Sequence, residues 1–249
     1  MFCYQCEQTA KGGCTRKGVC GKTDSTATLQ DLLLYLTKGL SQVAVAARSQ
    51  GIQDPAANLF TVKAVFSTLT NVNFDDARFV ALIRECVEKR DALRAKVSGV
   101  VFDGPAVLEP AADLEGMVAQ GKAFGVENDP EPNPDLKSLK QTLAYGLKGV
   151  AAYADHAAIL GREDNELYAK IQALLAATLQ TDLTLEQCVE AALECGRINI
   201  RAMELLDDAN TSAYGHPEPT TVKLGPTAGK AILVSGHDLK DLETLLRQT

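Results

Sequence analysis

Residues 29–51 read LQDLLLYLTKGLSQVAVAARSQG, and their apolar positions repeat with the period of an α-helix. Gly51 follows the last apolar position and is a suitable helix stop. We therefore predict a long helix with one buried face. The apolar positions are Leu29, Leu32, Leu33, Leu36, Leu40, Val43 and Ala47.

Two more helices are predicted directly after this one. Asp54 and Pro55 have the residue types preferred at the N-cap and first position of a helix, and Asp75 can cap the next helix. Gly99 lies just beyond it, so the three helices form one predicted unit. The apolar faces are Leu59, Val62, Phe66 and Leu69 in one helix and Phe79, Leu82, Ile83, Cys86, Leu93 and Val97 in the other.

Residues 100–134 have a different character. They hold a short helical piece near residues 114–118 and end in DPEPNPD, whose prolines cannot lie inside a helix. This run predicts a stiff, extended linker near residues 128–134. A second unit of three helices is predicted after Asp135, and its last helix opens with the capping box Thr184-x-x-Gln187.

The sequence changes again after residue 214. Residues 215–229 are rich in proline and glycine and indicate a boundary, and AILVS at 231–235 has the composition of a strand. Residues 239–248 form an amphipathic helical pattern. We predict a mainly α fold, with two three-helix units followed by the first strand–helix unit of an open α/β domain. The predicted divisions are a cysteine-rich loop at 1–25, a helical domain at 26–214, and the linker and start of a truncated α/β domain at 215–249.

Four of the seven cysteines lie within the first twenty residues. Cys3, Cys6, Cys14 and Cys20 have the spacing C-x2-C-x7-C-x5-C, and glycines lie among them. Such a segment has too few apolar residues for a core of its own, so bound metal is a reason for it to be ordered. Four thiolates suit either zinc or an iron–sulfur cluster. Four cysteines that lie unevenly spaced in one loop favour an iron–sulfur cluster, and zinc remains the alternative.

Disulfide bonds are the weaker interpretation of these cysteines. Met1 leads directly into Phe2 and Cys3, without the basic and apolar regions of a secretory signal. We therefore expect a cytoplasmic location, where thiols are more often ligands than bridges. The formal charge of −7 argues against nucleic-acid binding, and the sequence has no apolar run long enough to span a membrane.

Several stretches together resemble the hybrid cluster proteins, also called prismane proteins or hydroxylamine reductases. They are MFCYQCEQTAKGGCTRKGVCGK (1–22), LQDLLLYLTKGL (29–40), STLTNVNFD (67–75), AYGHPEPT (213–220) and GKAILVSGHDLKDLE (229–243). The resemblance runs from the first residue to the last. The cysteine spacing resembles the class of that family found in strict anaerobes.

The resemblance implies a set of cofactors and ligands. It implies that Cys3, Cys6, Cys14 and Cys20 bind one [4Fe-4S] cluster. It also implies that His237 is a ligand of the family's hybrid iron–sulfur–oxygen cluster. No other ligand of that second cluster can be matched, and family members are much longer. We therefore expect this chain to be an N-terminal part whose C-terminal half is a missing partner.

The function implied by the resemblance is reduction of hydroxylamine to ammonia and water, with nitric oxide as a rival substrate. The N-terminal cluster would pass electrons from a donor protein toward the hybrid cluster, where the small nitrogen substrate binds. Alternatives are a stand-alone electron-transfer module, a zinc-binding helical interaction protein, and a relative of carbon monoxide dehydrogenase. Cys86, Cys188 and Cys195 fall on predicted helices and are expected to pack in the core.

Overall fold

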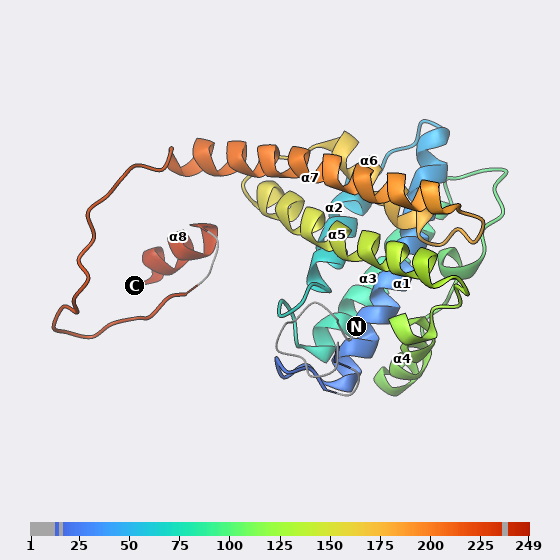
Figure 1. Ribbon diagram of the computed structural model, residues 1–249, viewed down its shortest axis with the longest axis horizontal. Helices are drawn as coiled ribbons and strands as arrows, with labels where there is room; N and C mark the ends of the chain where they lie inside the picture. The colour runs from blue at the N-terminus through green and yellow to red at the C-terminus, as the bar shows by residue number, and fades with distance from the viewer. Residues whose placement is uncertain (1–12, 15–16, 236–238) are drawn as a thin grey trace.

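The computed structural model describes residues 13–14, 17–235 and 239–249, and within them the chain is mainly α-helical with no strand. The helices are α1 (Asp24–Ser49), α2 (Pro55–Ser67), α3 (Asp76–Arg94), α4 (Leu114–Gly121), α5 (Pro134–Ile159), α6 (Asn165–Ala177), α7 (Leu185–Tyr214) and α8 (Leu239–Gln248), shown in Figure 1. Short 3₁₀ turns are η2 (Gly104–Ala106), η3 (Lys122–Phe124) and η4 (Val126–Asn128). None of the helices in these ranges is both long and apolar enough to cross a membrane.

The predicted helix starts are confirmed by their caps. The Asp54 side chain accepts from the Ala57 amide, and Asp75 accepts from the amides of the first turn of α3. Thr184 and Gln187 form both bonds of the capping box. The fifth helix starts slightly earlier than predicted, because Asn133 is its cap and Pro134 its first residue. A proline is tolerated there since the amide it lacks has no partner in the first turn of a helix.

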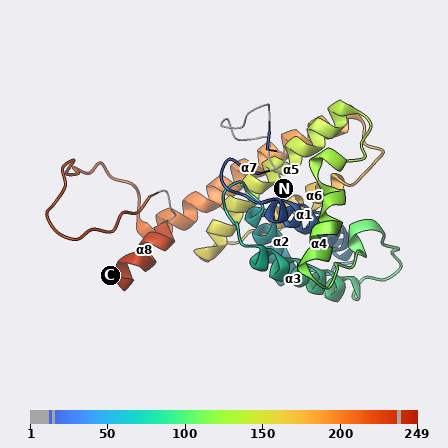
Figure 2. The ribbon, with the colours of Figure 1, turned by 90° about the horizontal axis from the view of Figure 1, so that it is seen from below.

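The core consists of two apolar clusters that share helices. One cluster joins α1 and α3 with part of α2, and it also buries Ala106 and Met117 from the segment after α3. The other joins α5, α6 and α7 with Leu34, Val62 and Val65 from α1 and α2. Helices α5 and α7 run side by side in both views (Figures 1 and 2). Helices α1 and α2 therefore connect the two three-helix sets through a common core.

The segment between α3 and α5 packs closely on α1 before it reaches the predicted linker at residues 128–134. A Cβ added to Gly39 would collide with the backbone of Pro105, and one added to Gly121 would collide with Thr28. The fully buried Arg90 of α3 holds the segment by donating to the Pro105 and Leu108 carbonyls, at 3.0 and 2.7 Å. Two glycines and one arginine thus fix this segment against the core.

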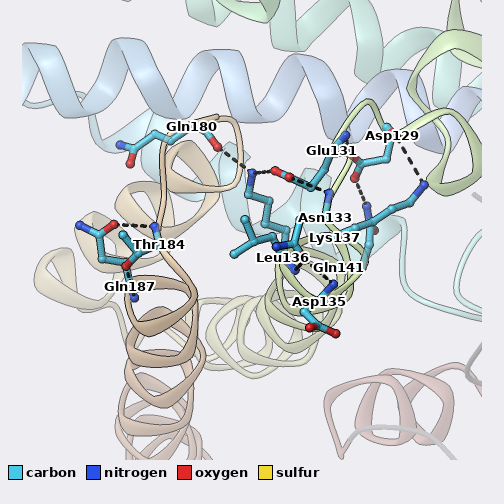
Figure 3. Close-up of polar contacts among 11 residues, drawn as sticks. Asp129, Glu131, Asn133, Asp135, Leu136, Lys137, Gln141, Gln180, Thr184 and Gln187 are labelled. Atoms are coloured by element: carbon cyan, nitrogen blue, oxygen red, sulfur yellow. Dashed lines mark hydrogen bonds and ion pairs between the residues drawn. The ribbon is translucent and has the colours of Figure 1, made fainter.

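The proline-rich end of the segment is fixed to the start of α5. The Lys140 Nζ donates to Glu131 Oε2 at 2.7 Å and to the Gln180 carbonyl at 2.8 Å, as drawn in Figure 3. Gln141 Nε2 donates to the Asp129 carboxylate at 2.8 Å. The run DPEPNPD therefore turns back along α5, and its acidic side chains lie against lysine and glutamine of that helix.

Residues 215–235 leave the helices and are exposed throughout (Figures 1 and 2). The predicted strand at 231–235 has no strand pairing with any described residue, so the open α/β domain stays a prediction. The predicted amphipathic helix is present as α8, and its Glu243 accepts a bond from the Tyr214 hydroxyl at 3.2 Å. This bond connects α8 with the end of α7.

Candidate metal centre

Only part of the predicted ligand set lies in the described residues. Cys3, Cys6 and His237 lie outside them, so their placement stays a prediction. Cys14 is buried, with 7% of its surface exposed, and Cys20 is exposed. Within the described ranges, no three His, Cys, Asp or Glu side chains are grouped closely enough to hold a metal ion.

Cys20 lies in a tight turn that is built around two glycines. The Gly21 amide donates to the Gly18 carbonyl, and the Gly18 amide donates to the Lys22 carbonyl, both at 2.9 Å. Gly21 has a φ of +95°, a region that glycine adopts without strain. A Cβ on Gly18 would lie 2.9 Å from Cys20 Sγ, so the thiol folds back over the glycine. The turn thus requires glycine at both positions to bring sulfur close to the backbone.

The start of α1, directly after this turn, is fixed to the first residue of α3 and to the loop before it, where the Thr26 hydroxyl donates to the Phe74 carbonyl at 3.4 Å. The hydroxyls of Ser25 and Thr26 each donate to the Asp76 carboxylate, at 2.5 Å. In the same loop Asn71 has a φ of +67°, and it is the one residue other than glycine with positive φ in the described part of the chain. The turn that carries Cys20 and residues 68–75 therefore belong to one connected region.

Sequence reasoning missed a group of charged side chains that act on Asp31. We call it the lysine cluster: Lys22, Lys38 and Lys148 around Asp31. Lys22 and Lys148 are almost fully buried, and the Lys148 Nζ donates to the Thr68 carbonyl at 3.1 Å. Burial raises the pKa of the Asp31 carboxyl, while the three lysines lie close enough to oppose that rise. Burial also lowers the pKa of Lys38 to about 8, against the opposing effect of Asp129 and Asp31.

A signal for this cluster was present in the sequence. Lys38 lies in LTKGL and Lys148 in GLKGV, where apolar residues of the buried helix faces surround a lysine. A lysine in such a position is almost never fully buried without a partner. The partner could not be identified from sequence, because the cluster joins side chains from α1, α5 and the turn before α1.

The remaining cysteines lie in the core, as predicted. Cys86 of α3 is fully buried beside Thr37, with 3.8 Å between Sγ and Oγ1, and burial raises its pKa to about 12. Cys188 and Cys195 of α7 are also buried. The predicted packing role of all three is confirmed. His156 contacts Phe66 edge-on, with 5.2 Å between ring centroids, and His216 is exposed.

Comparisons with known proteins cover the whole chain. It is 59% identical to a hydroxylamine reductase of Syntrophobacter fumaroxidans and 58% identical to one of Solidesulfovibrio magneticus. It is 54% identical to a hydroxylamine reductase of Methanocella arvoryzae. Each alignment covers 100% of this chain and 47% of the relative, so the chain spans about half the length of these relatives.

A sequence model described as the prismane/CO dehydrogenase family matches residues 1–249, which is the full length of the sequence. The match includes the cysteine-rich start, both three-helix sets and the segment that follows α7. The chain therefore belongs to the prismane/CO dehydrogenase family.

Proposed function

We propose that the complete protein is an iron–sulfur oxidoreductase that reduces hydroxylamine to ammonia and water. The observation that carries this proposal is the identity of 59% to a hydroxylamine reductase over the whole of this chain. The reaction consumes two electrons and two protons per hydroxylamine, so it needs a donor protein that supplies electrons. Nitric oxide is the rival substrate.

Within that protein, we assign this chain the electron-transfer centre. Cys3, Cys6, Cys14 and Cys20 would hold one [4Fe-4S] cluster, which supplies one-electron transfer when it is bound. The described residues fit such a group, because Cys14 and Cys20 both lie in the segment before α1 and the glycine turn brings the Cys20 sulfur against the backbone at Gly18. Cysteine thiolates are also the ligands that iron–sulfur clusters prefer.

We further assign His237 to the hybrid cluster of the complete protein. This role follows from the match of SGHDLKDLE to the family, and the remaining ligands would come from the C-terminal half. By itself the chain would then carry electrons and would not reduce substrate, since one imidazole cannot hold a multi-iron centre.

Anaerobic purification followed by iron, sulfide and zinc analysis tests the metal assignment. About four irons and four sulfides per chain, with visible charge-transfer absorption, are expected for residues 1–249 alone. Zinc without iron or sulfide would contradict the proposal and favour a zinc-binding interaction protein. A hydroxylamine assay on the complete protein distinguishes the remaining alternative, because bound clusters without turnover there would indicate a dedicated electron-transfer module.

A further inference from the structure

Helix α7 has two apolar faces, and only one of them is buried among the described residues. The buried face packs on α5 and α6 and belongs to the second core cluster. The other apolar side chains of α7 are between 43% and 61% exposed. They lie three, four or seven residues apart, which places them on one side of the helix. This row, which we call the α7 stripe, is Leu185, Val189, Leu193, Ile200 and Met203.

The α7 stripe is separate from the charged side of the helix. Arg197 donates to Glu190 at 2.7 Å and to Glu194 at 2.9 Å, and Arg201 donates to Asp164 at 2.8 Å. These charges pair with one another and leave the stripe purely apolar. A helix at the surface of a protein normally has one apolar face, with polar residues opposite it. A second, exposed apolar face of this length therefore indicates a contact surface.

A groove between α5 and α7 runs beside the stripe. Gly146 and Val150 of α5 and Gly196 of α7 line a hollow of about 300 Å³. Gly146 and Thr142 also line a second hollow of about 720 Å³, which reaches Val126, so the two hollows are continuous. A Cβ added to Gly196 would meet no atom within 4 Å, so the groove is open at this point. Gly196 also lies in the gap between the third and fourth members of the stripe, and it connects stripe and groove.

The proposed C-terminal half of the complete protein is the occupant that fits this surface. The aligned portion is 47% of the relatives, so a comparable length of chain lies outside it. The segment after α7 returns to the same two helices, because Leu239 of α8 lines a hollow together with Ile159 of α5 and Leu206 of α7. The Tyr214 hydroxyl also donates to Glu243 of α8 at 3.2 Å. Chain that continues from α8 would therefore begin beside α5 and α7.

A second copy of this chain is the weaker occupant. From Leu185 to Met203 the stripe is about 27 Å long, at a rise of about 1.5 Å per residue, and one helix face is about 10 Å wide. This strip offers about 300 Å², whereas stable complexes of separate proteins bury roughly 800 Å² on each partner. A contact within one chain needs less area, because the connecting segment gives it a high effective concentration.

We propose that the α7 stripe and the α5–α7 groove bind the C-terminal half of the complete protein. The bound segment presents apolar side chains to the stripe and enters the groove at Gly196, where no side chain of α7 fills the space. This contact fixes the position of the C-terminal half on the helical domain. The inference needs a complete protein longer than this chain and no particular metal, so a failed cluster assignment leaves it intact.

Photo-crosslinking in the complete protein tests this contact. p-Benzoylphenylalanine in place of Ile200 should form a crosslink, within one chain, to a peptide from outside residues 1–249. The same group in place of Glu190 is the matched control, because Glu190 lies on the charged side of α7 and is 63% exposed. A crosslink between two copies, or one confined to residues 1–249, would overturn the proposal. An equal yield from the Glu190 position would also overturn it, because the contact would then not be specific to the stripe.

Thiol labelling decides the question if the bulky photo-reactive group prevents folding. The Ile200→Cys and Glu190→Cys variants of the complete protein are reacted with a maleimide, at a dilution where sedimentation shows a monomer. Peptide mass spectrometry follows the introduced thiol apart from the native cysteines. Ile200→Cys should react at least about tenfold more slowly than Glu190→Cys, since a covered side chain reacts only when the contact opens. Equal rates in the monomer would overturn the proposal.

Discussion

Cys14 and Cys86 are both buried, but their surroundings differ in kind. Cys14 lies in the irregular segment before α1, in the same segment as Cys20, whereas Cys86 lies inside α3 among the apolar residues of the core. Burial raises the pKa of the Cys86 thiol to about 12, so it stays protonated and is a poor metal ligand at neutral pH. Substituting each of these two cysteines therefore tests the ligand assignment directly.

We predict that Cys14→Ser removes most of the visible iron–sulfur absorption. Cys86→Ser should retain the absorption while lowering the free energy of unfolding by about 1–3 kcal/mol, because it buries a hydroxyl in an apolar site. Absorption spectra and denaturant unfolding of both variants measure the two effects. The assignment is wrong if Cys86→Ser loses the cluster and Cys14→Ser keeps it.

Glu131 and Lys140 form an ion pair whose effect depends on pH. The hydrogen bond from Lys140 is the main cause that holds the pKa of the Glu131 carboxyl below its usual range. A carboxyl with a lowered pKa in the folded state stabilises the fold above its unfolded pKa of about 4.3. That contribution is lost as the pH falls through the folded value.

We therefore predict that Glu131→Gln is less stable than wild type at pH 7 and that the difference disappears in strong acid. Thermal melts between pH 7 and pH 3 measure it. Glu127→Gln, an exposed change in the same segment, is the control and should follow the wild-type curve. Parallel curves for Glu131→Gln and wild type over the whole range would contradict the assigned role of the pair.

At the scale of elements, the helices were predictable because their signals are local. Asp54, Asp75 and the Thr184–Gln187 box each bond within one turn of their own position. The packing of the segment before α5 was not predictable in this way. It depends on a contact between Gly39 of α1 and Pro105. The sequence around either residue does not indicate that it contacts the other. The lysine cluster was missed for the same reason.

The close contact at Gly39 leads to a prediction with an internal control. A Cβ at Gly39 would collide with the Pro105 carbonyl, a backbone atom that cannot move aside cheaply. Gly39→Ala should therefore destabilise the protein by about 2 kcal/mol or more. Gly149→Ala in α5 meets no atom within 4 Å, and it should stabilise the protein by up to about 1 kcal/mol through helix propensity. Denaturant unfolding compares them, and equal effects would show that the segment is not held against α1.

At the scale of the whole molecule, residues 215–235 differ from the rest of the described chain. Leu224 and Leu233 are 97% and 95% exposed, in a segment without secondary structure. The relatives are about twice as long as the portion aligned here. We expect further chain in the complete protein to cover these apolar side chains, because exposed apolar surface on this scale normally marks a contact site.

Hydrogen exchange measures that coverage. Amides of residues 222–235 should exchange quickly in residues 1–249 alone and at least about tenfold more slowly in the complete protein. The amides of α5 should exchange at similar rates in both and serve as the internal reference. Fast exchange of 222–235 in both proteins would exclude a packed strand at 231–235.

The last prediction concerns the separate ligands proposed for the two clusters, which are His237 for the hybrid cluster and the four cysteines for the N-terminal cluster. If His237 binds the hybrid cluster of the complete protein, His237→Ala should abolish hydroxylamine reduction and the hybrid-cluster EPR signal. The signal of the N-terminal cluster should persist, since its four cysteines are unchanged. His216→Ala is the matched control, because His216 is exposed and lies in the same segment after α7. Residues 1–249 alone should keep the N-terminal signal and form no ammonia from hydroxylamine. Normal activity of the His237→Ala protein would refute the ligand role of His237, and turnover by residues 1–249 would refute the assignment of substrate reduction to the C-terminal half.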